Sequence, residues 1–300
     1  MRQCVILNPN AGSATEIHAQ LARLGEHALF ETREPGDAAR FAQRAVDEGF
    51  DRVVAAGGDG TLNEVLNGLA DRFDRIELGL LPLGTANDFA RTAGIPAELD
   101  AAVDVLLRGK TQKVDVIKLT VCDEDRSHYF INVSTGGFAT KVDEKLEKRT
   151  KLWWGSLGYA LSAVKALPEL EPYEVTLSFD GEAAHTLDVY NIVVANARYV
   201  GGSVPIAPEA EFDDGLVDVL VFRAVSLSRL LTLVPKALLG QHITDEDVLY
   251  RRVRHFTVAS RPPFELNTDG EVVGMCPAEF EVLSRAVSFV VGTESGGATA

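Results

Sequence analysis

Residues 52–64 read RVVAAGGDGTLNE, the pattern of a buried strand followed by a glycine turn and a helix that begins near Thr61. The glycines let backbone N–H groups approach an anion without hindrance from Cβ atoms, and the positive end of the helix dipole lies at the same point. Asp59 places a carboxylate in this turn, which favours a metal ion or a substrate hydroxyl beside a phosphate. The segment therefore suggests Mg-nucleotide chemistry, and a tight turn closed by a Thr61–Glu64 capping box is the alternative.

Outward from this turn, the chain up to about residue 110 alternates short apolar runs with segments of helical period. We expect strands at 3–8, 28–32, 52–56 and 77–81, and helices at 15–24, 37–48, 62–69 and 99–107. This alternation is typical of a parallel, doubly wound, Rossmann-like sheet. Ligand loops in such sheets follow the carboxyl ends of the strands, so we expect one crevice to be shared by the segments 8–12, 32, 57–61 and 82–85.

After Lys110 apolar and polar residues alternate, which predicts half-buried antiparallel strands. The clearest strand patterns are at 174–179 and 252–258. Asp-Gly turn signals lie at 180–181, 214–215 and 269–270, and helical segments at 157–167 and 226–239. We expect the last of these helices to be part of the core, and membrane contact is the alternative.

Two domains are expected from this change of pattern. The first is an α/β nucleotide-binding domain over 1–120, and the second is an antiparallel β-sandwich domain over 121–285. The last strand, 286–291, is expected to return to the first domain, and residues 292–300 to form a flexible tail.

Composition narrows the class of protein. The chain has 300 residues and a formal net charge of −15, which argues against a nucleic-acid-binding protein because such proteins carry a basic face. Three scattered cysteines and six histidines show no metal-ligand spacing, which fits reduced thiols in the cytoplasm. No apolar run approaches the roughly 20 residues that span a bilayer, so any membrane contact is expected to be peripheral.

Six sequence blocks, in order, resemble the lipid kinases with a diacylglycerol kinase catalytic domain, a family that is related more distantly to sphingosine and ceramide kinases. The blocks are Asn8-Pro9-x-Ala11-Gly12, residues 57–64, residues 82–91, Gly136-Gly137-Phe138, Pro208 with Asp214-Gly215-Leu216, and Asp269-Gly270-Glu271. The Gly-Gly-Asp-Gly turn alone also occurs in NAD kinases, whereas the block PLGTANDFAR at 82–91 resembles the lipid branch.

The resemblance implies that loops of the first domain bind ATP. It assigns this role to Asn8, Pro9, Asn10, Ala11, Gly12, Thr32, Gly58, Asp59, Gly60, Thr61, Leu62, Asn63, Glu64 and Thr85. Backbone amides of the glycine turn would hold phosphate oxygens, and hydroxyl groups would donate further hydrogen bonds. Turn and cap chemistry is the alternative for each of these segments.

The resemblance also implies a catalytic base and a metal site. Glu271 would accept the proton of a lipid hydroxyl, with Asp269 and Asp59 close by across the domain cleft. A structural Mg²⁺ would be bound by Asp214 and the backbone carbonyls of Glu211 and Leu216, and extended through water by Asp115. The alternatives are a plain hairpin turn at 269–271, and a turn residue and a solvated strand residue at the two metal-site aspartates.

Residues 145–154 read KLEKRTKLWW and place four cations beside Trp153 and Trp154, which suits a membrane headgroup interface or, alternatively, a core helix with a charged lead-in. The resemblance implies an ATP- and Mg-dependent lipid kinase at the inner membrane face, with diacylglycerol as the leading acceptor and phosphatidic acid as product. An NAD kinase-like enzyme with a soluble acceptor and a nucleotide-binding regulator without turnover stay open. The sequence is also compatible with a homodimer.

Overall fold

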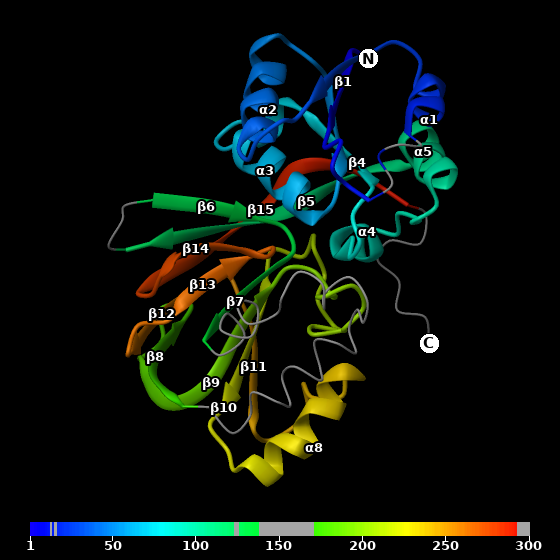
Figure 1. Cartoon of the computed structure of the whole chain (residues 1–300). Coiled ribbons are helices and arrows are strands. Elements are labelled where there is room, and N and C mark those ends of the chain that lie inside the picture. The colour runs from blue at the N-terminus through cyan, green and yellow to red at the C-terminus, as the bar shows by residue number, and fades with distance from the viewer. Residues whose placement is uncertain (13, 15–16, 123–125, 138–170, 293–300) are drawn as a thin grey trace. The chain divides into compact units, whose positions relative to one another are not determined.

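The structure of the chain, a computed structural model, describes residues 1–12, 14, 17–122, 126–137 and 171–292 (Figure 1). It divides into two compact units, Met1–Val116 with Ser284–Ala300, and Ile117–Leu283. Strands β5 (Lys110–Val121) and β15 (Ala278–Val291) contribute residues to both units. The expected helix at 157–167, the basic segment with Trp153 and Trp154, and the tail from residue 293 lie outside the described residues.

The first unit is built on a parallel sheet, as the sequence predicts. Its strands follow the order β2-β1-β3-β4, and the end of β15 pairs with β4 in parallel at Ser288 and Glu77. The strands are β1 (Gln3–Leu7), β2 (His27–Glu31), β3 (Arg52–Gly57) and β4 (Glu77–Pro82). The helices are α1 (Ile17–Arg23), α2 (Asp37–Asp47), α3 (Asp59–Gly68), α4 (Asp88–Thr92) and α5 (Leu99–Arg108), with a 3₁₀ turn at Phe73–Arg75.

The inner strands of this sheet are buried on both faces. In β3 the run Val53, Val54, Ala55 and Ala56 is fully buried, which explains its continuous apolar sequence. Helices α2 and α3 pack against each other, and α1 packs against α5. The contact between α2 and α3 is close, because a Cβ atom at Gly68 would lie 2.2 Å from the carbonyl oxygen of Ala39.

The second unit is antiparallel, again as predicted. Its strands are β6 (Arg126–Phe130), β7 (Val133–Gly137), β8 (Tyr173–Phe179), β9 (His185–Ala195), β10 (Val217–Arg223), β11 (Val248–Val253), β12 (His255–Arg261), β13 (Glu265–Thr268) and β14 (Glu271–Met275), together with the first half of β15 and the second half of β5. They pair in the order β14-β13-β7-β9-β8-β12-β15, while β10 lies between β9 and β11 and β6 pairs with β5. Helix α8 spans Leu227–Leu238.

Two apolar clusters lie on opposite faces of the central strand β9. Ile192 and Val194 belong to one cluster, and Val193 and Ala195 belong to the other. The second cluster also contains Leu233 of α8, so this helix covers one face of the sheet. The period-two alternation in the sequence is therefore a true two-sided burial pattern.

The expected continuous strand at 252–258 is wrong. Strand β11 ends at Val253, and β12 begins at His255 with different pairing partners. At the break, the carboxylate of Asp180 accepts the backbone N–H groups of Arg254 and His255, each at 2.9 Å. A side chain from a distant turn thus satisfies the donors that a continuous strand would have paired with a neighbour.

Candidate functional site

The loops predicted to bind nucleotide begin at the carboxyl ends of the strands in the first unit's sheet. The backbone N–H of Asn8 donates to the carbonyl of Ala56 at 2.9 Å, which joins the end of β1 to the end of β3. Two further bonds of 2.9 Å run from Thr32 to Leu7 and from Leu83 to Gly57. These bonds fix the starts of the four loops relative to one another.

Asn8 links two of these loops through its side chain. Its Nδ2 donates to Thr61 Oγ1 at 3.3 Å, and its Oδ1 accepts the backbone N–H of Asn10 at 3.0 Å. Thr61 is buried in the first turn of α3, whereas Pro9 and Asn10 are exposed. The side chain of Asn8 therefore shapes its own loop and connects that loop to the glycine turn.

The glycine turn leaves the N-terminus of α3 without a side-chain cap. Gly58 is its N-cap residue, and the first helical bond runs from the N–H of Leu62 to the carbonyl of Gly58 at 3.1 Å. The earlier amides of the helix have no such partner by geometry, which suits an anion. The helix begins at Asp59 rather than near Thr61 as expected.

Close contacts with neighbouring atoms explain some of the glycines but not all of them. A Cβ atom at Gly57 would lie 2.3 Å from Thr61 Oγ1, and one at Gly84 would lie 2.6 Å from the Cα of Gly58. At Gly60 a Cβ atom would meet nothing within 4 Å. The fold therefore requires glycine at 57 and 84, while the space beside Gly60 is open.

Asp59 caps a helix, α4, that the sequence pattern does not predict. Its Oδ2 accepts the N–H of Asp88 at 3.1 Å and its Oδ1 accepts the N–H of Phe89 at 3.2 Å, at the start of α4. Burial raises the pKa of the Asp59 carboxyl, and these N–H groups oppose that shift by favouring the ionised form. The role predicted for Asp59 beside a metal ion or hydroxyl stays a prediction.

The alternative of a capping box at Thr61 and Glu64 is wrong. Glu64 Oε2 accepts the N–H groups of Gly36 and Ala38, at 3.0 and 3.2 Å, so its carboxylate holds the N-terminus of α2. Thr61 lies within the helix and contacts Asn8 instead. The spacing of Thr61 and Glu64 fits a capping box, but the Glu64 carboxylate binds the N–H groups at the start of α2 instead.

Asn87 was missed as a residue that shapes the loop after β4. It adopts the left-handed conformation with φ of 49°, its Nδ2 donates to the carbonyl of Gly84 at 2.7 Å, and its Oδ1 accepts the N–H of Gly84 at 3.0 Å. The residue type is the one hint that the sequence offers, since Asn tolerates the left-handed conformation better than most residues. Thr85 is exposed in the loop that Asn87 closes.

The candidate base lies on a tight hairpin of the second unit. Asp269 and Gly270, with φ of 51° and 92°, form the two-residue turn between β13 and β14, and exposed Glu271 begins β14. Asp269 exchanges two bonds with Val133, donating its N–H at 3.1 Å and accepting at Oδ1 at 3.2 Å. The turn is thus held to β7 by its own aspartate.

The predicted metal residues are divided between the two units. In the second unit, Asp214 Oδ1 accepts the N–H of Leu216 at 2.9 Å, its other oxygen is ion-paired with Arg252, and Glu211 is exposed. In the first unit, Asp115 is fully buried and its Oδ1 accepts the N–H of Arg285 at 2.5 Å.

Within the described residues, no three His, Cys, Asp or Glu side chains are grouped to hold a metal ion. The metal site predicted at Asp214 takes two of its ligands from backbone carbonyls, so it does not require three such side chains. It remains a prediction. No helix in the described ranges is long and apolar enough to span a bilayer.

Comparison with known proteins gives the family. Residues 2–119 match the diacylglycerol kinase catalytic domain, and residues 132–291 match the YegS C-terminal NAD kinase beta sandwich-like domain. A diacylglycerol kinase of Bacillus subtilis is 35% identical over 98% of this chain and 97% of its own length. The chain belongs to the diacylglycerol kinase family.

Other members of the diacylglycerol kinase family agree with this assignment. A diacylglycerol kinase of Staphylococcus haemolyticus is 32% identical over 96% of this chain and 88% of its own length. A crystal structure of a Bacillus anthracis family member superposes with a TM-score of 0.85 at 26% identity, covering 98% of this chain and 96% of that one. The chain is therefore a lipid kinase with an α/β first domain and a β-sandwich-like second domain, and both fold predictions are confirmed.

Proposed function

We propose that this lipid kinase transfers the γ-phosphoryl group of ATP to the hydroxyl of diacylglycerol and forms phosphatidic acid. The observation that carries the proposal is the uncapped N-terminus of α3 beside open space at Gly60, among the loops that Asn8, Thr32 and Leu83 tie together. Such a cradle fits a polyphosphate, because its amides and helix dipole favour negative charge.

The remaining predicted residues of the first unit have roles that fit this proposal. The side chain of Thr85 is exposed in its loop and that of Thr32 is partly buried, so both can offer hydroxyl donors to phosphate or ribose. Residues 8–12 form the neighbouring loop, and residues 58–64 supply the turn and the first helical residues. Glu64 contributes indirectly, since it fixes α2.

Glu271 is proposed as the base. Its exposed carboxylate, at the start of β14, can accept the proton that the lipid hydroxyl loses late in phosphoryl transfer. Asp269 serves the same step by fixing the hairpin, and Asp59 by fixing α4 beside the glycine turn. A bound Mg²⁺ supplies neutralisation of the phosphate oxygens.

Asp214 is proposed to hold a structural Mg²⁺ with the carbonyls of Glu211 and Leu216. An all-oxygen donor set suits this hard cation, and the Arg252 guanidinium is its competitor for the carboxylate. Asp115 is proposed to extend the site through water.

The test supplies radiolabelled ATP and Mg²⁺ together with diacylglycerol in detergent micelles, or with NAD as the soluble acceptor. We expect label in the lipid product, and we expect Glu271→Ala to remove this transfer while ATP still binds. Glu281→Ala, at another exposed glutamate on β15, is the matched control and should keep full turnover.

Each contrary outcome points to a different reading. Label in the nucleotide product would favour an NAD kinase-like enzyme, and ATP binding without any transfer would favour a regulator. Normal turnover in Glu271→Ala would leave the lipid kinase in place but remove Glu271 as its base.

A further inference from the structure

Helix α8 has two apolar faces, although the sequence predicts a core helix. Leu230 and Leu233 are buried against the sheet. On the outer side, exposed apolar residues recur at every fourth position and form what we call the leucine stripe: Leu227, Leu231, Pro235 and, just past the helix end, Leu239. Its leucines are 48%, 52% and 67% exposed, respectively.

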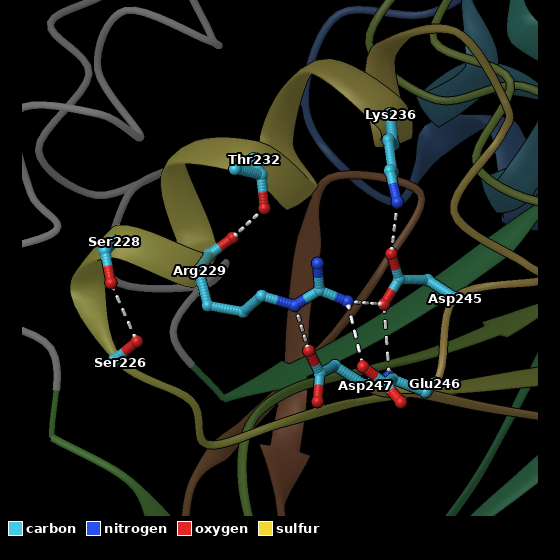
Figure 2. A network of polar contacts seen from close by, with 8 residues as sticks. All are labelled: Ser226, Ser228, Arg229, Thr232, Lys236, Asp245, Glu246 and Asp247. Atoms are coloured by element: carbon cyan, nitrogen blue, oxygen red, sulfur yellow. Dashed lines mark hydrogen bonds and ion pairs between the residues drawn. The ribbon is translucent and has the colours of Figure 1, made fainter.

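The hydroxyl groups beside the stripe already have partners. Thr232 Oγ1 donates to the carbonyl of Arg229 at 2.7 Å, and the hydroxyls of Ser226 and Ser228 lie 3.0 Å apart (Figure 2). Removing these groups from water therefore costs less than removing unpaired hydroxyls would.

The two cations of the helix are neutralised by a single loop. Arg229 Nη2 lies 2.6 Å from Asp245 Oδ1, and Lys236 Nζ lies 2.7 Å from Asp245 Oδ2, while Arg229 also pairs with Asp247 (Figure 2). Asp245 is almost fully buried, and its bond from Lys236 lowers the pKa of its carboxyl. The helix thus adds no unpaired positive charge to the stripe.

The charge around this helix differs from that of the whole chain. Exposed Glu246 adds a third carboxylate 3.7 Å from Arg229, and Arg223, whose N–H donates to the carbonyl of Asp247, adds a third cation. Arg223 is exposed and its side chain has no ion pair within the described residues. Local charge is therefore balanced here, so an anionic bilayer repels this helix less than the net charge of −15 for the whole chain would suggest.

We propose that the leucine stripe of α8 docks on a lipid bilayer and inserts shallowly at the acyl boundary. The inference rests on the proposed function, because diacylglycerol resides in the bilayer and the kinase must reach it there. An apolar helix face with satisfied hydroxyls and paired cations suits this interface, and the exposed side chain of Arg223 can contact anionic headgroups.

The test is flotation with vesicles of phosphatidylcholine, with and without phosphatidylglycerol. We expect wild-type protein to float, and Leu227→Ser/Leu231→Ser to partition about tenfold less, since two half-exposed leucines lose their burial in lipid. Leu107→Ser is the matched control, because this leucine of α5 is 47% exposed, and its partitioning should not change.

Unchanged thermal unfolding establishes that the variants fold, and Leu227→Ala/Leu231→Ala serves if the serine variant does not. Equal flotation of all proteins, or no flotation of the wild type, overturns the proposal. A wild-type dimer that the α8 substitutions split, with flotation unchanged, overturns it in favour of a second copy. Kinase activity on diacylglycerol in detergent micelles separates the two proposals: flotation without activity sinks the proposed function alone, and activity without stripe-dependent flotation sinks only the docking surface.

Discussion

The fold has room for a side chain at Gly60, so a substitution there tests whether a bound ligand needs glycine at this position. It is the second residue of α3, its φ is not positive, and a Cβ atom there would meet nothing within 4 Å. Alanine is a better helix former than glycine by about 0.5–1 kcal/mol. We therefore expect Gly60→Ala to stabilise the apo protein by up to that amount and to raise Tm by about 1–3 °C.

The same substitution should weaken nucleotide binding. If ATP phosphates approach the backbone at the glycine turn, the new methyl group occupies the space they need. We expect the Kd for a non-hydrolysable ATP analogue to rise at least about tenfold, which corresponds to about 1.4 kcal/mol. Calorimetric titration and thermal unfolding of one sample measure both effects.

Gly57→Ala provides the contrast. Its Cβ atom would lie 2.3 Å from Thr61 Oγ1, so this variant should lose stability as well as affinity. A Gly60→Ala protein that is more stable and binds the analogue with unchanged Kd would refute the placement of phosphate at this turn.

Two further predictions concern stability. Gly68→Ala should destabilise the first unit by at least about 2 kcal/mol in urea unfolding, because its Cβ atom would lie 2.2 Å from the Ala39 carbonyl oxygen of α2. A loss of unfolding free energy below about 0.5 kcal/mol would mean that α2 and α3 can move apart without cost. Burial lowers the pKa of His242 below its usual 6.5, so the unfolded chain takes up a proton that the folded chain does not, and stability falls as pH falls below about 6.5. His242→Gln should flatten this part of the profile of Tm against pH, and an equal slope in both proteins would show that His242 does not titrate differently on folding.

The sequence predicts the strands of the first unit well because their burial is continuous and local. Val53 to Ala56 are fully buried, and their continuous apolar sequence predicts this burial directly. Alternation serves equally well for β8, whose residues are alternately buried and exposed at its start. Periodicity could not predict α4, because five residues are too few to show a helical repeat.

Carboxylates that bind donors far away in the sequence account for two predictions that the structure overturns. Glu64 has the spacing of a local cap but binds the start of α2, and Asp180 divides a strand more than 70 positions away. Asp59 likewise caps α4 across 29 positions. In each case the donor that the side chain satisfies is brought near only by folding, so a local pattern cannot identify it.

The contact of Gly58 with Gly84, together with the bonds from Asp59 to Asp88 and Phe89, bears on how such kinases can be recombined. A chimera that imported the loop after β4 from a relative would have to keep a glycine facing Gly58 and a helix start within reach of the Asp59 carboxylate. The segment from β3 through α4, residues 52–92, contains both partners of each of these contacts, so a chimera cut inside it would separate them.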